Sequence, residues 1–411
     1  MTKIIVITST FPKSGQDKVP AFVRDQIINL KTQYNHLNFH VLAPSYSDKT
    51  KIEKVKEFDE IRYHYFWPRR YEKLAGRGIL PALKENKLRY FLIPFFVIFQ
   101  LINLIILTKK VKPDIIYAHW FTPQAITTCI VSILFNVPFV FTTHAQDVII
   151  LKKIPIFGKF IANFVIRRAS AWTSDSIMTE ENLKNTINIT HYKKEKGLVA
   201  PMPINDTDYL NTEPDKFIQI DHDKNKYLLF IGRFAEKKGV ESLLDIFKEL
   251  IEENNNLFLI LAGDGPLKKS YKKRIEEIGI DKSKVIFTGY VNKAQKKFLF
   301  EESDFFIAPS LVTKEGDVEG LPVVILESLY FGKVTIASYQ SNATEIISDR
   351  ENGFIIDPTN ITESKEKIKE ILKLNENEIN KVKKNAKILG ERFTDKHLTK
   401  KYYEHLFDPL I

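Results

Sequence analysis

The chain has 411 residues, a formal net charge of +10 and an apolar content of 44%. This length fits two domains of about 200 residues each, and the apolar content excludes a disordered chain. The single cysteine, Cys129, excludes an internal disulfide framework and a cysteine-rich metal site. The first residues form only a short apolar run without a small-residue cleavage pattern, so we expect the first buried strand of a cytosolic protein.

Short apolar runs alternate with helical patterns along the whole chain, which is typical of parallel sheets covered on both faces. In the first half we expect strands near residues 3–9, 39–43, 61–66, 114–119, 138–142, 171–174 and 197–200. Helical patterns lie between them, near residues 21–34, 90–110, 122–135, 158–169 and 179–188. The predicted fold class is therefore α/β, with a doubly wound first domain.

A polar segment rich in Pro, Asn and Asp, residues 201–226, interrupts this rhythm. A second series of strands follows, near residues 227–234, 257–263, 284–289, 304–310, 333–338 and 353–357. We predict an N-terminal domain over residues 1–205 and a C-terminal domain over residues 206–390, with the amphipathic tail 391–411 packing back on the first domain. Open α/β sheets bind ligands at the carboxyl ends of their strands, so we expect a ligand cleft between two facing domains.

The segment EGLPVVILE, residues 319–327, places two carboxylates around a helix start. Pro322 lacks an N–H and suits the first position of a helix, so Glu319 falls in the preceding loop. Glu327 then lies about a turn and a half into the helix. We expect its side chain and that of Lys238 to face solvent. The alternative is an ordinary helix start with one exposed and one paired glutamate.

Backbone amides at the start of this helix would form an anion site, because they point out of its positive end. These amides lie around Gly320, Leu321 and Val323. A diphosphate fits the amides, and a diol further on fits the carboxylate of Glu327, which can accept hydrogen bonds from two hydroxyls. A nucleotide sugar has this layout.

A basic loop, GRFAEKKGV, follows one predicted strand and opens a helix. Arg233 and Lys238 would place a planar guanidinium and a mobile ammonium on one diphosphate. Solvated surface charge is the alternative. Two Gly-rich turns after later strands, AGDGP at residues 262–266 and TGYV at residues 288–291, would bring backbone close to a ligand, although glycine also serves plain turns.

The ordered series GRFAEKKG, AGDGP, FTGYV, EGLPVVILE and NGFIIDP resembles the nucleotide-sugar domain of the retaining glycosyltransferases of family 4, which have the two-domain GT-B fold. The resemblance covers most of residues 227–357. It implies that Arg233 and Lys238 bind the diphosphate of the sugar donor. It also implies that Glu327 holds the ribose and that Glu319 lies against the transferred sugar.

In the same family the Gly-Leu-Pro amides face phosphate or sugar, and the backbone of the TGYV segment lies near the base. The resemblance therefore adds three further candidates for binding the sugar donor, which are Gly263, Tyr290 and Val291.

The first half is similar to the acceptor domain of this family in two strand-end motifs, PDIIYAHWFTP at residues 113–123 and FTTHAQDV at residues 141–148. His144 matches the family histidine beside the sugar and the reaction centre, and the resemblance assigns it a catalytic role together with Glu319. A buried, satisfied side chain is the alternative for a strand-end histidine. His119 and Asp147 are further candidates.

Two positions depart from the family pattern. Relatives often have a glycine in the loop after the first strand, where this chain has Pro20 and the nearest glycine is Gly15. Ser341 and Asn342 stand where a Gly pair commonly precedes the segment that contains Glu345, so we assign Glu345 no role.

Two Asp-X-Asp triplets, residues 206–208 and 221–223, lie in the polar linker rather than at the end of an early buried strand. We interpret them as capping and loop residues, and expect neither a catalytic metal nor a cofactor. Walker, Cys/His-cluster and nucleophile-elbow motifs are absent from the sequence.

The predicted reaction is metal-independent hexosyl transfer with retention, from a UDP- or GDP-type sugar nucleotide to a hydroxyl of a glycan or lipid-linked acceptor in surface polysaccharide biosynthesis. Two alternatives stay open. One is a nucleotide-sugar epimerase of the same architecture, and the other is a basic lipid- or nucleic-acid-binding protein without catalysis.

Residues 91–107, FLIPFFVIFQLINLIIL, reach the low end of a membrane span in length. A true span would separate the two domains, so we expect either a buried helix or a helix that lies in the membrane surface. In the second case four side chains would enter the lipid, namely Phe91, Phe95, Phe96 and Phe99.

Residues 60–112 carry eleven Lys and Arg against three Glu. This excess predicts contact with an anionic membrane surface through residues 62–110. We therefore expect a cytoplasmic protein, peripheral on the inner face of the cell membrane, without a nucleic-acid partner.

Overall fold

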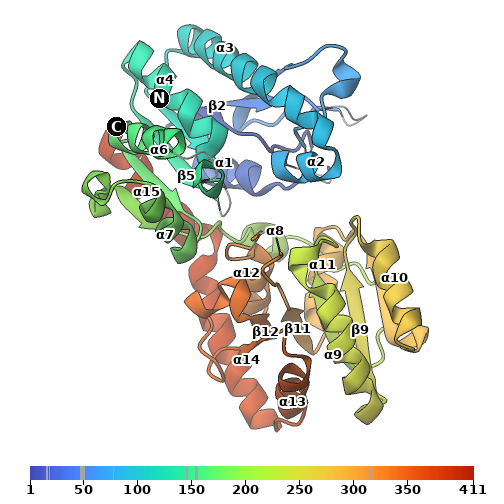
Figure 1. The fold of residues 1–411 in the computed structure, drawn as a ribbon. Coiled ribbons are helices and arrows are strands. Elements are labelled where there is room, and N and C mark those ends of the chain that lie inside the picture. Colours follow the sequence, from blue (N-terminus) through green and yellow to red (C-terminus); the bar gives the residue numbers. More distant parts are fainter. Residues whose placement is uncertain are drawn as a thin grey trace. The chain divides into compact units, whose positions relative to one another are not determined.

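The protein is described by a computed structural model at residues 1–14, 17, 19–46, 51–76, 78–144, 147–152, 156–314, 316–317 and 319–411. The chain divides into two compact units. The first unit contains Met1–Pro203 and Asp395–Ile411, and the second contains Ile204–Thr394. Each unit has one parallel sheet with helices packed against it (Figure 1).

The first unit has a seven-stranded sheet in the order β3-β2-β1-β4-β5-β6-β7. Its strands are β1 Thr2–Ile7, β2 Leu37–Pro44, β3 Phe58–Tyr63, β4 Ile115–His119, β5 Phe139–Thr143, β6 Ala171–Ser174 and β7 Gly197–Val199. Four consecutive residues of β1, Ile4 to Ile7, are fully buried. Helices cover both faces of this sheet, which explains why its central strands are continuous apolar runs.

The helices of the first unit are α1 Phe22–Gln33, α2 Ile79–Glu85, α3 Ile93–Val111, α4 Ile126–Phe135, α5 Ile149–Lys152, α6 Phe157–Arg168, α7 Ile177–Thr186 and α15 Asp395–Leu406. On one face α3 contacts α4, and α4 contacts α6 (Figure 1). On the other face α1 contacts α15. The ring of Tyr403 in α15 stacks on Tyr34 with centroids 3.6 Å apart, so the C-terminal segment packs on the first unit.

The second unit has a six-stranded sheet in the order β10-β9-β8-β11-β12-β13. Its strands are β8 Lys226–Ile231, β9 Leu257–Ala262, β10 Val285–Gly289, β11 Phe305–Ala308, β12 Val334–Ser338 and β13 Phe354–Ile356. Its helices are α8 Asp206–Leu210, α9 Val240–Glu253, α10 Lys268–Glu277, α11 Lys293–Glu302, α12 Val323–Tyr330, α13 Ile361–Leu372 and α14 Glu376–Gly390.

Each sheet reverses its strand order once. In the first unit the chain runs from β1 through β2 to β3 and then returns to β4 on the other side of β1. In the second unit the same reversal occurs between β8 and β11. Loops that follow the two strands at such a switch point diverge, and the crevice between them is where open α/β sheets bind ligands.

Every strand predicted from the sequence is present, with ends displaced by a few residues. The short helices α2 and α5 were not predicted. Both precede or follow loops and are too short to show a clear helical period.

The apolar segment 91–107 forms most of α3, and only one face of this helix is buried. Phe96 and Leu104 pack into the core, and Gln100 hydrogen-bonds Thr127 Oγ1 over 2.6 Å. Ile106 on the opposite face is 58% exposed. The helix is therefore buried on one face and exposed on the other. The expectation that Phe96 enters lipid is wrong, because that ring is 1% exposed.

Length and composition make one described segment, Lys87–Val111, a candidate for crossing a membrane. Its mean hydropathy is 2.4, and 33% of its most apolar window is buried against the rest of the chain. A core helix of a globular unit meets the same criterion, so this property alone does not assign a span.

Candidate functional site

The loops after β8 and β11 approach each other closely at the switch point of the second unit. The loop after β8 contains Arg233, which is partly exposed, and the 3-10 turn Glu236–Lys238. Gly239 ends this turn with a φ of 67°, and a Cβ there would lie 1.8 Å from the carbonyl oxygen of Pro309 after β11. Glycine is therefore required for the two loops to meet.

A second close approach involves Gly263, one of the predicted candidates. A Cβ at this position would lie 1.9 Å from the carbonyl oxygen of Gly232. Gly263 thus lets the loop after β9 pack against the loop after β8, and it supports the loop that carries Arg233 and Lys238.

Glu319 joins the two loops through ion pairs. Its Oε2 lies 3.0 Å from Lys238 Nζ, and its Oε1 lies 3.1 Å from Lys237 Nζ. Burial by itself raises the pKa of Glu319, but the ammonium groups of Lys238 and Lys237 outweigh it and lower the pKa to about 2. Glu319 is therefore ionised throughout the physiological range and accepts hydrogen bonds rather than supplying a proton.

Lys237 is held by two carboxylates. Besides Glu319, its Nζ lies 3.4 Å from Asp317 Oδ1. Burial alone lowers the pKa of Lys237, but the charges of Glu319 and Asp317 raise it above its usual value. The ammonium therefore keeps its proton and its positive charge.

The helix after Glu319, α12, starts at Val323 with Pro322 as its N-cap. Glu327 lies in its second turn and is only 7% exposed. Its Oε1 accepts hydrogen bonds from Tyr209 Oη at 2.8 Å and from Lys296 Nζ at 2.7 Å. Within the described part of the chain no donor reaches Oε2, which leaves this oxygen for a ligand hydroxyl.

The expectation that Lys238 and Glu327 face solvent is wrong. Their side chains are 17% and 10% exposed. Lys238 turns toward Glu319, and residues from α8 and α11 cover Glu327. The physical reason is that an ionised carboxylate forms charge-assisted hydrogen bonds with nearby cations and hydroxyls, and these bonds are already present before a ligand binds.

The segment before α12 is also held by Asn342. Its Nδ2 donates to the carbonyl oxygen of Glu319 at 2.7 Å, and its backbone is left-handed with a φ of 55°. Asparagine tolerates this conformation better than most residues. Asn342 thus keeps the backbone shape that a glycine would adopt here and adds a contact to the Glu319 loop.

The remaining candidates of the second unit lie at different depths. The side chain of Leu321 packs in an apolar cluster with Tyr209 and Leu326, so only its backbone is available to a ligand. Tyr290 and Val291 follow the edge strand β10, where Tyr290 is exposed and Val291 is buried. The structure places Tyr290 and Val291 two strands away from the switch point at β8.

In the first unit the predicted histidines meet at the carboxyl ends of β4 and β5. His119 Nδ1 lies 3.4 Å from His144 Nε2, and the two rings stack with an interplanar angle of 15°. Burial, and next the neighbouring His144, hold the pKa of His119 well below its usual value, so this imidazole is neutral. Its Nε2 has no hydrogen-bond partner among the described residues.

His144 is enclosed by side chains from three other segments. Asp175, directly after β6, places Oδ2 3.7 Å from His144 Nδ1. The rings of Trp120 and Phe22 lie 5.0 and 5.4 Å from the imidazole. These contacts fix the orientation of the ring at the end of the sheet.

Asp147 accepts hydrogen bonds from neighbouring backbone amides and from one hydroxyl. Its Oδ2 accepts from the amides of Phe121 at 2.6 Å and His144 at 3.1 Å, and its Oδ1 accepts from the Thr143 hydroxyl at 2.5 Å. Burial raises the pKa of Asp147 to about 6. Both oxygens are occupied, so Asp147 is a positioning residue that holds the backbone at His144.

The Asp-X-Asp triplets form local structure. Asp206 and Asp208 lie in the first turn of α8, and Asp208 pairs with Lys293. Asp221 Oδ1 accepts from the amide of Asp223 at 3.1 Å. Across the described ranges no cluster of three or more His, Cys, Asp or Glu has the geometry of a metal site. Gly15 lies outside the described residues, as do residues 145 and 146 of the second strand-end motif.

Sequence reasoning missed several residues of these sites. Lys237 could have been chosen as a candidate, because it is next to Lys238 in the basic loop after β8. Lys296 and Tyr209 are 31 and 118 positions from Glu327, and no motif connects them. Asp175 could have been found as a third strand-end polar residue, since it directly follows β6.

Comparisons with known proteins match both units to the same kind of enzyme. The family described as "Glycosyl transferases group 1" matches residues 211–388, and the family described as "Glycosyl transferase 4-like" matches residues 80–176. An uncharacterised glycosyltransferase of Methanocaldococcus jannaschii is 26% identical over 86% of this chain and 93% of its own length.

A second relative and a solved structure extend this comparison. The Campylobacter jejuni enzyme "GalNAc-alpha-(1->4)-GalNAc-alpha-(1->3)-diNAcBac-PP-undecaprenol alpha-1,4-N-acetyl-D-galactosaminyltransferase" is 23% identical over 87% of this chain and 85% of its own length. The crystal structure of Anabaena HepE in complex with UDP covers 98% of this chain and 99% of its own, with a TM-score of 0.70 and 17% identity. This likeness confirms the predicted two-domain GT-B fold.

The raised pKa of Asp147 predicts a pH-dependent stability. The folded state binds a proton more tightly than the unfolded chain, so this contribution is complete below the ordinary pKa of 3.8 and is lost as pH rises through about 6. The loss amounts to about 3 kcal/mol. Asp147→Asn keeps the shape and removes the titration, so the unfolding free energy of the variant minus that of the parent should rise by about 2.4 kcal/mol between pH 4 and 7, the part of the loss that falls in this interval.

Urea unfolding at several pH values in this range measures the difference. The comparison cancels the titration of all other groups, because they are the same in both proteins. A difference that stays constant with pH would contradict the raised pKa.

Proposed function

We propose that this chain, which belongs to the group 1 glycosyl transferases, is a retaining, metal-independent hexosyltransferase. It moves a sugar from a UDP- or GDP-type nucleotide to a hydroxyl of a glycan or lipid-linked acceptor, in surface polysaccharide or glycolipid biosynthesis. The observation that carries this proposal is the meeting of Lys238, Glu319 and the start of α12 at the switch point of the second unit. The UDP complex of HepE and the acceptor in the name of the Campylobacter enzyme support it.

The diphosphate of the sugar donor would replace Glu319 as the ion-pair partner of Lys238. Arg233 and the amides at the start of α12 would supply further positive groups. Charges that are fixed before the reaction stabilise the departing diphosphate without the cost of reorganising water, and each such group commonly contributes a few kcal/mol. Glu327 would accept the ribose hydroxyls through Oε2.

The proton of the acceptor would pass to the leaving phosphate. Glu319 is ionised and paired with two ammonium groups, so it holds hydroxyls of the sugar and does not act as an acid. His144 would contact the reacting sugar. This assignment needs no metal ion, because lysine, arginine and helix amides carry the charge compensation.

Sugar-donor binding should depend on Lys238 and Glu327. A panel of UDP- and GDP-sugars is screened by thermal shift in the presence of EDTA, where a ligand at a hundred times its Kd adds about 2.7 kcal/mol. Lys238→Ala and Glu327→Gln should lose the shift, whereas the exposed Lys273→Ala should keep it. An unchanged shift in folded Lys238→Ala would contradict the assignment of Lys238 to the diphosphate. A shift seen only with a divalent cation would contradict the proposed metal independence.

His144→Ala should lower turnover far more than affinity for the sugar nucleotide. The imidazole is proposed to touch the sugar, so the loss appears in kcat, by roughly a hundredfold, with little change in KM. Release of nucleoside diphosphate is the readout, since it does not require the acceptor to be known. The control is His222→Ala, an exposed histidine that pairs with Glu302. A change in KM alone would contradict the placement of His144.

A membrane-facing surface would suit a lipid-linked acceptor. We define the apolar helix layer as the exposed apolar side chains of α3, α4 and α6 together with Phe91. They are Phe91, Ile98, Phe99, Ile102, Ile106, Ile130, Ile133, Leu134, Phe157, Phe160 and Phe164. The three helices contain no Asp or Glu and carry five Lys or Arg.

This combination favours an anionic bilayer as the occupant of the layer. Apolar side chains enter the lipid while the surrounding cations meet the headgroups. We therefore propose that the protein is cytoplasmic and peripheral on the inner face of the cell membrane.

Flotation with liposomes tests the apolar helix layer. The protein should float with phosphatidylglycerol vesicles at low salt and less at high salt, because each cation near the surface contributes about 1 kcal/mol that salt screens. Ile102→Glu with Ile106→Glu should abolish flotation, whereas Leu210→Glu, an exposed leucine of α8, should not. Equal binding to neutral vesicles, or none at low salt, would contradict the proposal.

A further inference from the structure

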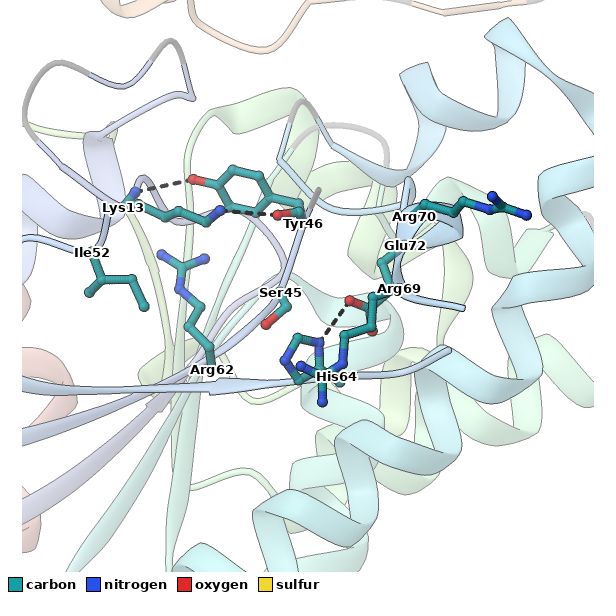
Figure 2. Close-up of a pocket in the computed structure, with 9 residues that line it drawn as sticks. All are labelled: Lys13, Ser45, Tyr46, Ile52, Arg62, His64, Arg69, Arg70 and Glu72. Carbon is teal, nitrogen blue, oxygen red and sulfur yellow. Dashed lines mark hydrogen bonds and ion pairs between the residues drawn. The ribbon is translucent and has the colours of Figure 1, made fainter. Parts of the chain in front are cut away.

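A separate pocket of about 440 Å³ opens in the first unit at the carboxyl ends of β1, β2 and β3 (Figure 2). Basic side chains from three segments line it. They are Lys13 after β1, Arg62 and His64 at the end of β3, and Arg69 and Arg70 in the 3-10 turn Arg69–Tyr71. The carboxyl edge of a parallel sheet is the usual ligand side of an α/β unit.

Basic side chains outnumber carboxylates among the described residues of this pocket. Among the described residues that line it, the one carboxylate is Glu72, which is already used by His64 Nδ1 at 2.8 Å and by the amide of Tyr65 at 2.7 Å. Arg62 pairs with Glu60 behind the pocket. The described lining thus contains four Lys or Arg and one carboxylate whose hydrogen bonds are already formed.

Arg62 and Lys13 are held in place by the backbone. Arg62 donates to the carbonyl oxygens of Phe11 at 2.9 Å and Pro44 at 3.1 Å. Lys13 Nζ donates to the carbonyl oxygen of Tyr46 at 3.0 Å (Figure 2). These bonds fix two cations at one wall of the pocket.

The two arginines of the turn differ from each other. Neither forms an ion pair with any residue in the described part of the chain. Arg70 lies over the ring of Tyr71, 5.0 Å from its centroid, and extends away from the other labelled side chains in Figure 2. Arg69 is exposed and stays beside His64, so it is the cation most available to an anion in the pocket.

Aromatic side chains connect the rim of the pocket to the apolar helix layer. The ring of Phe66 contacts Phe95 with centroids 5.4 Å apart and Phe91 with centroids 6.4 Å apart. Trp67, two residues before Arg69, is 81% exposed. A cationic pocket beside an exposed apolar surface fits an anion that carries an alkyl chain.

We propose that this pocket binds the phosphate or diphosphate group of the lipid-linked acceptor. The inference rests on the proposed function, because an acceptor is needed only if the chain is a transferase. Arg69 and Lys13 contact the phosphate oxygens, and Trp67 and Phe91 contact the start of the lipid chain.

Inorganic pyrophosphate, titrated calorimetrically into the full chain, tests the pocket. All measurements are made in Lys238→Ala, which removes the other diphosphate site. Adding Arg69→Ala should weaken binding at least about tenfold, because a charge-assisted bond to phosphate is lost. Adding Arg70→Ala instead makes the same charge change one residue away and should leave binding nearly unchanged. No binding in Lys238→Ala, or equal weakening by both arginine variants, would overturn the proposal.

The source of the phosphate is separated by two further probes. Geranyl diphosphate should bind more tightly than pyrophosphate, and Trp67→Ala should remove the difference, if the ligand carries a lipid chain. Equal affinities would overturn the lipid-linked assignment. Arg69→Ala should still float with phosphatidylglycerol vesicles, and loss of flotation would replace the acceptor with a phospholipid headgroup.

Failure of this inference is distinguishable from failure of the proposed function. Arg69→Ala should keep the thermal shift with sugar nucleotides that Lys238→Ala loses. If no sugar nucleotide shifts the parent protein, the transferase assignment fails, and with it the identification of the ligand as an acceptor.

Discussion

The candidate site at the switch point of the second unit depends on one buried carboxylate, Glu319, between two ammonium groups. Lys237 and Lys238 are consecutive in the chain, and their like charges would repel each other if Glu319 and Asp317 did not face them. Breaking a buried pair by removing one partner commonly costs about 3–5 kcal/mol, because the other charge stays buried. The loop after β8 and the segment before α12 are therefore fixed to each other before any ligand binds. The diphosphate of the proposed sugar donor would then meet cations that are already held at the switch point, and such groups stabilise a leaving group on which charge develops.

Two buried carboxylates of this chain have pKa values shifted in opposite directions, although burial raises both. Asp147 accepts hydrogen bonds from one hydroxyl and two amides, and burial outweighs these bonds and the nearby His144 and raises its pKa to about 6. Glu319 is buried as well, but the ammonium groups of Lys238 and Lys237 lower its pKa to about 2. The direction of the pKa shift is therefore set by the neighbouring charges and not by how deeply the carboxylate is buried. In the first unit the chain therefore uses a carboxylate to hold backbone near His144, and in the second it keeps one as a permanent anion.

The strands and their order of appearance were predictable from the sequence, because buried parallel strands are short apolar runs between helical periods. The sequence also allowed three site residues to be chosen, namely Lys238, Glu319 and Glu327, since a loop and a helix start define their positions locally. The burial of Glu327 was not predictable, because Tyr209 and Lys296, which cover it, belong to elements that are distant in the sequence. Hydropathy marked α3 as apolar all round, but only the tertiary structure decides which face has a partner. The pocket of Figure 2 combines Lys13 with residues more than 45 positions later, and no local pattern records that meeting.

The segment between β3 and α3 connects two surfaces that sequence inspection treats separately. Its backbone is held by Glu72, which accepts from the amides of Tyr65 and Phe66. This fixes Phe66 against Phe91 and Phe95 on one side, and the turn that carries Arg69 on the other. A lipid-linked phosphate has the same order of chemistry, with an alkyl chain directly attached to an anion. This turn thus presents apolar and cationic groups next to each other, and the hydrogen bonds of Glu72 hold the backbone that leads into it.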